Sequence, residues 1–316
     1  MRCVALADEL ARLGCAVTFL CRALEGNSIE AIKHAVKVLE NNVEFHSNQL
    51  YLNWLGATEE EDAEQTIKAM PKVADLLIVD SYALSQVWHK QLRPYTKKIL
   101  VIDDLANRQF DCDILLNQNF GIKRSAYEGK VRRDTELLLG CEYALLRAEF
   151  AEKRNEARIR RHQSSKITNI LVSLGGSDID NVTYDVLKQI DNTLNIVVVL
   201  GSASPHNKMI KDYAKKRNIE VVIDADNMAD LMLNADIAIG AGGSTSWERC
   251  CLGLPTLLCI LAENQRSGAV QLEKQGAAAV IRDLANDLQA IMENPQYHKA
   301  MSDNAMSICD GLGCRR

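Results

Sequence analysis

The chain contains short apolar runs that do not alternate with polar residues, such as Ile196-Val197-Val198-Val199-Leu200. A strand of this kind must be covered on both faces, which is typical of a parallel sheet between helices. Amphipathic segments separate the runs almost throughout the 316 residues, and this alternation favours an α/β fold. Because the length suffices for two hydrophobic cores, we expect two doubly wound, Rossmann-like domains.

The expected strands fall into two groups. The first group covers residues 16–20, 76–79, 98–102 and 113–116, and the second covers 169–173, 195–200, 220–223, 236–239, 256–260 and 278–281. The charged, serine-ended segment 151–166 lies between the groups, and we expect it to be a solvated linker. The sequence therefore predicts an N-terminal domain over 1–150, the linker, and a C-terminal domain over 167–316.

Two helix starts are also predicted. Thr58 and Glu61 have the spacing of a capping box at the start of a helix that ends near Met70. Ser204 is the expected cap of another helix, with Pro205 at its first position.

The composition excludes several classes of protein. The net charge of −5 argues against a nucleic-acid binder, and no apolar stretch approaches the ~18 residues that a membrane span needs. The ten cysteines include no C-x-x-C pair and the six histidines are scattered, so we expect free thiols in a reducing cytoplasm, no metal site and no cofactor.

Two glycine-rich loops follow expected strands of the C-terminal domain. One contains Gly175, Gly176 and Ser177, and the other contains Gly242, Gly243, Ser244 and Thr245. Glycines let the backbone approach a ligand, and a helix capped by Ser244 or Thr245 would direct free N–H groups at an anion such as a diphosphate. A tight turn without a ligand is the alternative. Neither the P-loop nor the dinucleotide fingerprint fits, since Thr245 stands where the third glycine belongs.

Glu248 lies one turn into the helix after the second loop. Its carboxylate could accept hydrogen bonds from both hydroxyls of a ribose, which points to a nucleotide diphosphate sugar. The alternative is a first-turn glutamate that interacts with the helix dipole.

Polar residues follow three other expected strands. Asp80-Ser81-Tyr82 comes after strand 76–79, Asp103-Asp104 after strand 98–102, and Asn264 after strand 256–260. The Asp103-Asp104 pair could hold a metal or act as acid and base, or else form a turn with contacts to the neighbouring Asn107 and Arg108. Asn264 could cap a helix or donate a hydrogen bond to a sugar.

With these residues assembled, the chain resembles the UDP-2,4-diacetamido-2,4,6-trideoxy-β-L-altropyranose hydrolases of pseudaminic acid biosynthesis. The resemblance runs from Arg2 to Gln265 and is most specific in GAGGSTSWERCCLGLPT and IDDLANR. The other matching stretches are RCVALADELARLGCAVTFLCR, LLIVDSYAL, KILVIDDLANRQFDCDILLNQN, LLGCEYALLRAEF, ILVSLGGSDIDNVT, GAGGSTSWERCCLGLPTLL and AENQ.

The resemblance implies a GT-B-like fold, similar to that of the transferase that makes lipid II. It also implies metal-independent, inverting hydrolysis of a UDP-sugar by a bacterial enzyme whose product feeds a nonulosonic acid for flagellin or surface polysaccharide. Tyr82 and Asn264 would be catalytic and orient sugar or water. The substrate-binding residues would be Ser81, Gly175, Gly176, Ser177, Gly242, Gly243, Ser244, Thr245, Glu248 and Asn264, with residues 242–245 at the diphosphate and Glu248 at the ribose.

The N-terminus departs from the family pattern. A helix with Leu6, Leu10 and Leu13 on one face leads into strand 16–20, as a βαβ unit continues rather than begins. In the family a first strand runs into G-x-G-H-x-x-R-C, whose histidine is the proposed general base, and this chain has only Arg2-Cys3 of that motif. We expect Met1 to be an internal methionine, and the chain as given to be impaired.

Two other functions remain open from the sequence. A GT-B glycosyltransferase that uses a UDP-amino sugar would share the fold and the nucleotide site, and a UDP-sugar binder would lack turnover. In each case the expected partner is a UDP-sugar, with no nucleic acid and no membrane, and we expect a monomer.

Overall fold

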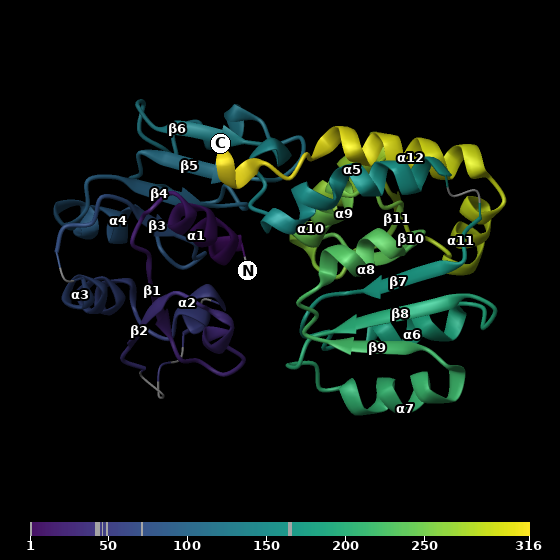
Figure 1. Cartoon of the computed structure of the whole chain (residues 1–316). Coiled ribbons are helices and arrows are strands. Elements are labelled where there is room, and N and C mark those ends of the chain that lie inside the picture. Colours follow the sequence, from purple (N-terminus) through teal and green to yellow (C-terminus); the bar gives the residue numbers. More distant parts are fainter. Residues whose placement is uncertain (1, 42–44, 46, 49, 71, 164–165) are drawn as a thin grey trace. The chain divides into compact units, whose positions relative to one another are not determined.

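The computed structural model describes the chain except residues 1, 42–44, 46, 49, 71 and 164–165. The chain divides into two compact units: unit 1 comprises Met1–Leu145 together with Cys314–Arg316, and unit 2 comprises Leu146–Gly313. Figure 1 shows the course of the chain from the N-terminal to the C-terminal end. In the described residues no helix is long and apolar enough to cross a membrane.

Unit 2 contains one parallel sheet of six strands in the order β12-β11-β10-β7-β8-β9. The strands are β7 (Asn169–Ser173), β8 (Asn195–Leu200), β9 (Glu220–Ile223), β10 (Ile237–Ala241), β11 (Thr256–Cys259) and β12 (Ala279–Val280). The sequence predicted β7, β8 and β9 with these bounds, because their apolar runs end sharply at polar residues. The order is that of a doubly wound Rossmann sheet, with β7 and β10 at its centre.

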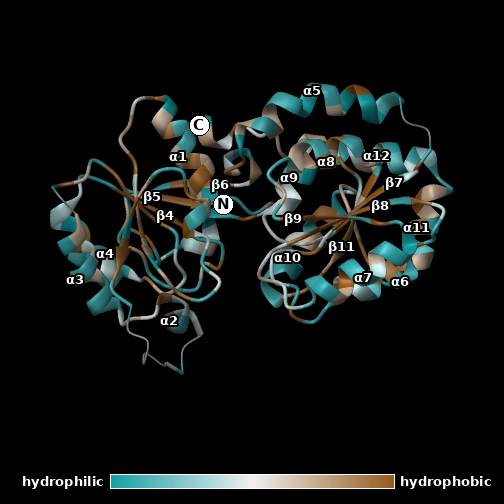
Figure 2. Ribbon diagram, turned by 60° about the horizontal axis from the view of Figure 1, so that its bottom comes forward, coloured by the Kyte–Doolittle hydropathy of each residue, from teal (hydrophilic) through white to brown (hydrophobic). Residues whose placement is uncertain are grey.

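Helices cover both faces of this sheet, and Figure 2 shows its apolar strands gathered between them. The helices of this unit are α5 (Ala148–Gln163), α6 (Val182–Gln189), α7 (Asn207–Arg217), α8 (Met228–Asn234), α9 (Thr245–Cys251), α10 (Glu263–Lys274), α11 (Leu284–Met292) and α12 (Pro295–Ile308). Of these, α5 packs on the helices α8, α9 and α12 rather than on the sheet itself. The core between the layers includes the fully buried Val172, Val198 and Ile237. This burial explains why the strands lack alternation.

Unit 1 contains two separate parallel sheets in its described part. One pairs β1 (Thr18–Arg22) with β2 (Ala35–Leu39), and the other has the order β3-β4-β5-β6. The members of the second sheet are β3 (Leu77–Val79), β4 (Ile99–Ile102), β5 (Ile114–Asn117) and β6 (Glu136–Leu139). β2 and β6 were not among the expected strands; β2 is mostly exposed, β6 is partly buried, and each contains a charged residue.

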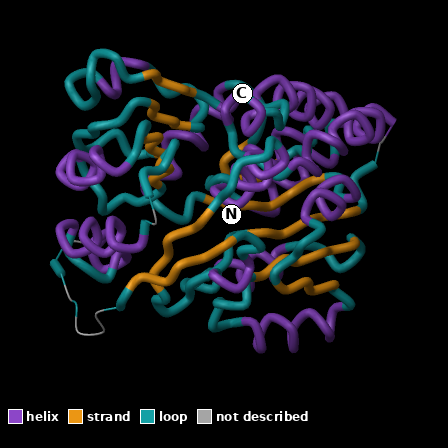
Figure 3. Tube along the Cα trace, turned by 60° about the vertical axis from the view of Figure 1, so that its left-hand side comes forward, coloured by secondary structure: helices purple, strands orange, loops and turns teal. Residues whose placement is uncertain are grey.

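The helices of unit 1 are α1 (Arg2–Arg12), α2 (Leu50–Leu55), α3 (Glu59–Ala69) and α4 (Gln86–Leu92), with short 3-10 turns η1 (Ile29–Ala31), η2 (Arg93–Tyr95), η3 (Arg124–Tyr127) and η4 (Cys141–Tyr143). Figure 3 shows helices beside the strands of each unit. The capping box of α3 is confirmed: the Glu61 N–H donates to the Thr58 Oγ1 at 3.1 Å and the Thr58 N–H to Glu61 Oε2 at 3.0 Å. It stabilises the start of a helix that begins with four acidic residues.

The expected solvated linker over 151–166 is wrong for its described part, which is mostly the helix α5 within unit 2. Three of its arginines, Arg154, Arg160 and Arg161, donate to carbonyl groups at the ends of other elements, whereas Arg158 is exposed. Arg154 bonds the carbonyls of Cys251, Met306 and Cys309 at 2.6–2.8 Å, and Arg161 is buried and bonds the Met232 carbonyl at 2.7 Å. The domain boundary accordingly lies at Leu145 and Leu146.

The expected start of a helix at Ser204 and Pro205 is also wrong. Helix α7 begins at Asn207, with His206 at the cap position. Ser204 is buried, and its N–H donates to the Gly201 carbonyl at 3.1 Å in a turn that precedes the helix. The Asn207 side chain donates to the same carbonyl at 2.8 Å and joins this turn to the first residue of the helix.

Candidate functional site

The centre of the unit 2 sheet brings the two glycine-rich loops together. Neighbouring strands β7 and β10 pair in parallel with Ser173 opposite Gly240, and the chain leaves them toward opposite sides of the sheet. The carboxyl edge at such a switch point is where doubly wound sheets bind ligands. The loops of Gly175 and of Gly242 both start from this edge.

The first loop is held by backbone contact with a neighbouring loop. Gly175 has a φ of +106°, which favours glycine. A Cβ on Gly201 would lie 2.6 Å from the Gly176 Cα, so only glycine fits at position 201. Gly175, Gly176 and Ser177 are exposed. One side of their loop therefore packs against Gly201, and the other side faces solvent.

The helix after this first loop already carries an anion at its N-terminus. The buried Asp178 accepts hydrogen bonds from the N–H groups of Val182 (2.9 Å) and Thr183 (3.1 Å) at the start of α6. A ligand phosphate at this end would meet the Asp178 carboxylate. Any contribution of this loop to anion binding must therefore come from Gly175–Ser177 themselves.

The second loop leads into α9 without a side-chain cap. Ser244 takes the cap position with φ −59° and ψ −28°, and its hydroxyl makes no capping hydrogen bond. The prediction of the helix start is confirmed, but neither Ser244 nor Thr245 caps it through its side chain. The Ser244 hydroxyl is exposed and makes no capping bond, and the N–H groups of Ser246 and Trp247 donate instead to the carbonyls of Gly243 (2.9 Å) and Ser244 (3.1 Å).

Arg249 lies buried beneath the second loop, with 2% of its surface exposed. Its Nη2 donates to the Ala241 carbonyl at 2.6 Å and to the Ser246 hydroxyl at 2.9 Å. Burial lowers the pKa of the guanidinium to about 10, which leaves it charged near neutral pH. A Cβ on Gly240 would come within 2.7 Å of its Cζ, so this glycine makes room for the cation.

Arg249 was not among the residues expected at the site. One signal was present in the sequence: Arg249 directly precedes the apolar run Cys250 to Leu252, where an unpaired cation is costly to bury.

Glu248 is half-buried one turn into α9. Burial raises the pKa of its carboxyl group to about 7; Arg147 and Arg249 oppose this shift, while Glu149 adds to it. Hydroxyl groups of a ligand that donate hydrogen bonds to this carboxyl group would favour its ionised form and lower its pKa.

Asn264 is the second residue of α10, and its side chain is exposed. The alternative role as a helix cap is wrong, since Ala262 occupies the cap position. The next residue, Gln265, packs beside Gly242: a Cβ on this glycine would lie 3.3 Å from the Gln265 Cβ. Asn264 is thereby placed at the same sheet edge as the second loop.

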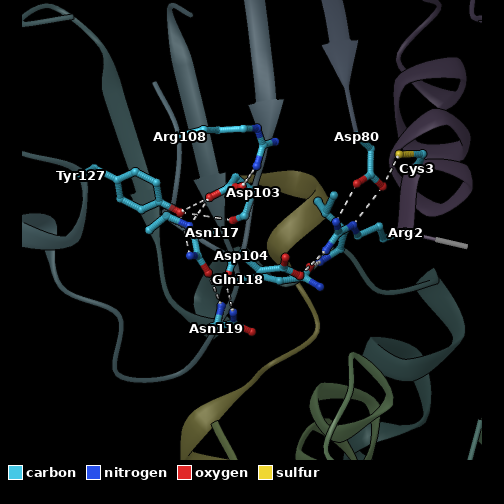
Figure 4. Close-up of polar contacts among 12 residues, drawn as sticks. Arg2, Cys3, Asp80, Asp103, Asp104, Arg108, Asn117, Gln118, Asn119 and Tyr127 are labelled. Carbon is cyan, nitrogen blue, oxygen red and sulfur yellow. Dashed lines mark hydrogen bonds and ion pairs between the residues drawn. The ribbon is translucent and has the colours of Figure 1, made fainter. Parts of the chain in front are cut away.

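Unit 1 contains a polar network at the carboxyl ends of β3 and β4 (Figure 4). Arg2, at the start of α1, bonds Asp80 through two nitrogens at 2.6 and 2.9 Å and Asp104 at 3.2 Å. The Cys3 thiol donates to Asp80 at 3.2 Å. The sequence analysis had placed Asp80 and Asp104 near a site but missed that Arg2, 78 residues earlier, joins them.

Tyr82 lies next to this network, close to the Asp104 carboxylate. Burial, together with this carboxylate, raises the pKa of the phenol above its ordinary value, so the hydroxyl keeps its proton. Ser81 shapes the turn: its hydroxyl accepts the Ala83 N–H at 3.3 Å and its carbonyl accepts Arg108 Nη2 at 2.8 Å.

Of the two roles that the sequence left open for Asp103, the structure shows the turn and not a metal site or an acid–base pair. It is fully buried and accepts hydrogen bonds from the Ala106 N–H (2.7 Å), Arg108 Nη1 (2.8 Å) and the Tyr127 hydroxyl (2.9 Å). These partners make it a turn-forming residue. No cluster of three or more metal-ligating side chains occurs among the residues with described positions.

Residues 169–310 match the glycosyltransferase family 28 C-terminal domain. Over 99% of its length the chain is also similar in structure to MurG of Acinetobacter baumannii, with a TM-score of 0.64 at 16% identity over 93% of that chain. Together with the two Rossmann-like units, this similarity shows a GT-B-like fold.

Sequence similarity to named proteins identifies the family of the chain. The chain is 31% identical to the UDP-2,4-diacetamido-2,4,6-trideoxy-β-L-altropyranose hydrolase of Campylobacter jejuni over 82% of this chain and 86% of that protein. It is also 31% identical to the spore coat polysaccharide biosynthesis protein SpsG of Bacillus subtilis, over 78% and 75% of the two chains. The chain belongs to the family of the UDP-2,4-diacetamido-2,4,6-trideoxy-β-L-altropyranose hydrolases.

Proposed function

We propose that this protein hydrolyses UDP-2,4-diacetamido-2,4,6-trideoxy-β-L-altropyranose in the bacterial cytoplasm, for pseudaminic acid synthesis and flagellin or surface glycosylation. The observation that carries the proposal is the identity with the Campylobacter jejuni hydrolase over most of both chains. A bifunctional pseudaminic acid cytidylyltransferase and hydrolase of Helicobacter pylori, 23% identical, adds support.

In the proposed reaction, the oxygen of water attacks the anomeric carbon on the face opposite UDP. The bond from this carbon to the phosphate oxygen breaks, UDP leaves with the electron pair, and the water gives up a proton. The products are UDP and 2,4-diacetamido-2,4,6-trideoxy-L-altrose with inverted configuration. In this family-derived scheme no metal takes part.

The nucleotide end of the substrate is assigned to unit 2. The glycine-rich backbone of residues 242–245 before α9 suits a diphosphate, and the buried Arg249 adds positive charge below it. Glu248 is assigned to the ribose hydroxyls. Gly175, Gly176 and Ser177 offer further backbone contacts on the neighbouring loop.

The sugar end is assigned to Tyr82, Ser81 and Asn264. Burial and the nearby Asp104 carboxylate keep the Tyr82 hydroxyl protonated, and a phenol hydroxyl can donate a hydrogen bond to, or accept one from, water or an amide of the sugar. We assign no general base. In unit 1, His89 is fully buried and burial lowers its pKa to about 3, which makes it too weak a base for this role.

A glycosyltransferase that uses a UDP-amino sugar is the second candidate. The family 28 match of residues 169–310 and the similarity to SpsG favour it. The two functions differ only in what attacks the anomeric carbon, so the same nucleotide site serves both.

The deciding experiment measures UDP release from the altropyranose nucleotide, with the anomer of the product followed by proton NMR. It uses this chain and a form that carries the family's G-x-G-H segment before Arg2. In the active form, Tyr82→Phe is expected to lower kcat by ~10²-fold, in line with loss of a group that positions a reactant. Tyr95→Phe, at an exposed tyrosine of the same unit, is the control and should change kcat less than twofold.

If neither form releases UDP while both bind it, hydrolysis is the wrong reaction. Sugar transfer to an added polysaccharide or lipid acceptor would then support the glycosyltransferase, and binding without any turnover would leave a UDP-sugar binder.

A further inference from the structure

Unit 1 presents three aromatic side chains in mutual contact beside the polar network. Tyr51 and Trp54 lie on α2, and Tyr82 follows β3. The ring centroid of Tyr51 lies 5.2 Å from that of Trp54 and 5.2 Å from that of Tyr82. The Trp54 and Tyr82 centroids are 6.4 Å apart. We call these three residues the aromatic platform.

The platform is open to solvent at Trp54. This side chain is 59% exposed, whereas Trp88 and Trp247 are 3% exposed each. Tryptophan carries a large apolar area, and leaving most of it in water gives up the stabilisation that burial would bring. Most of the Trp54 ring is therefore accessible to a ligand.

Tyr82 connects the platform to the polar network. Its ring contacts Tyr51, and its phenol lies close to Asp104, which pairs with Arg2. A ligand that hydrogen-bonds at the Tyr82 hydroxyl thus meets aromatic rings next to it. That arrangement suits a molecule with polar amides and adjacent apolar groups.

We propose that the aromatic platform binds the methyl-bearing face of the sugar and that Trp54 determines specificity for it. The inference rests on the proposed function. The altropyranose of that substrate has two acetamido groups and no oxygen at C6, so it carries three methyl groups where a common hexose has hydroxyls. C–H groups pack against aromatic faces, and the platform is uncharged, in keeping with this surface.

The test uses the exposure of Trp54 as its readout. Iodide quenching of tryptophan fluorescence reports almost only Trp54, because the other two tryptophans are buried. The ligand is the phosphonate analogue of the altropyranose nucleotide, in which a methylene replaces the anomeric oxygen and prevents cleavage. We expect it to halve the quenching constant or lower it further, and UDP alone to leave it unchanged.

Two variants complete the test. Trp54→Ala should weaken binding of the analogue about tenfold and leave the affinity for UDP within twofold, while Trp54→Phe should restore most of the loss. Tyr95→Ala, which removes an exposed aromatic ring elsewhere in unit 1, should change neither affinity.

The outcomes separate the two proposals. If the analogue binds tightly but Trp54 stays open to iodide and Trp54→Ala binds normally, the platform is not the sugar site although the proposed function stands. If the analogue binds no better than UDP in every form, the proposed substrate is wrong and this inference falls with it.

Discussion

At the scale of single residues, Glu248 makes a prediction about pH. Burial raises its carboxyl pKa from 4.5 to about 7, so the folded protein resists ionisation that the unfolded chain allows. The neutral form's stabilisation is complete below pH 4.5 and is lost as the pH rises through 7. Glu248→Gln should therefore match the wild type near pH 4.5 and exceed it in free energy of unfolding by up to about 3 kcal/mol at pH 8.

Urea unfolding at several pH values measures this difference. Glu263→Gln, at an exposed first-turn glutamate of α10, is the matched control and should show little pH-dependent gain. In the same series, the affinity of the wild type for UDP should rise relative to Glu248→Gln between pH 6 and 8, because the ionised carboxylate accepts ribose hydroxyls. A parallel pH profile for both proteins would argue against the ribose role.

At the scale of elements, the glycine loops depend on close backbone contact. Gly201→Ala would bring a Cβ to 2.6 Å from the Gly176 Cα, where no flexible side chain can yield. We expect a loss of about 1–3 kcal/mol in the free energy of unfolding and at least tenfold weaker UDP binding, measured by calorimetry. Unchanged UDP affinity would show that loop 175–177 does not contact the nucleotide.

Gly268→Ala is the control for the destabilisation that we expect from Gly201→Ala. Gly268 lies within α10, and no atom lies within 4 Å of where its Cβ would be. Alanine there should raise the free energy of unfolding by about 0.5–1 kcal/mol, because it relieves the entropic cost of a helical glycine.

The elements also show how far the sequence could lead. The apolar strands of unit 2 were predictable, because burial on both faces leaves an uninterrupted apolar run. β2 is mostly exposed, and Lys37 interrupts its apolar residues, so the sequence did not indicate a strand there. The two glycine loops were predictable because each follows an expected strand. The sequence did not indicate that Asp178 accepts the N–H groups at the start of α6, or that Arg249 is buried beneath the second loop. The contacts of Arg2 join residues 78 and 102 positions apart, which no local pattern encodes.

At the scale of the whole molecule, unit 1 is built from two separate parts of the chain. Residues Cys314–Arg316 belong to it, and Cys314 packs against the cluster of Leu100, Ile102 and Leu116. Deleting residues 314–316 should destabilise unit 1 by about 1–2 kcal/mol and leave unit 2 unaffected. Hydrogen exchange would show this as faster exchange in β4 and β5 but not in β7; equal changes in both units would contradict it.

This membership bears on how unit 1 matures during synthesis. Domains generally fold as they emerge from the ribosome, the N-terminal one first. Here residues 1–145 emerge early but lack Cys314–Arg316 until unit 2, which is continuous in sequence, has been translated. Unit 1 therefore completes its own contacts no earlier than unit 2 has been synthesised.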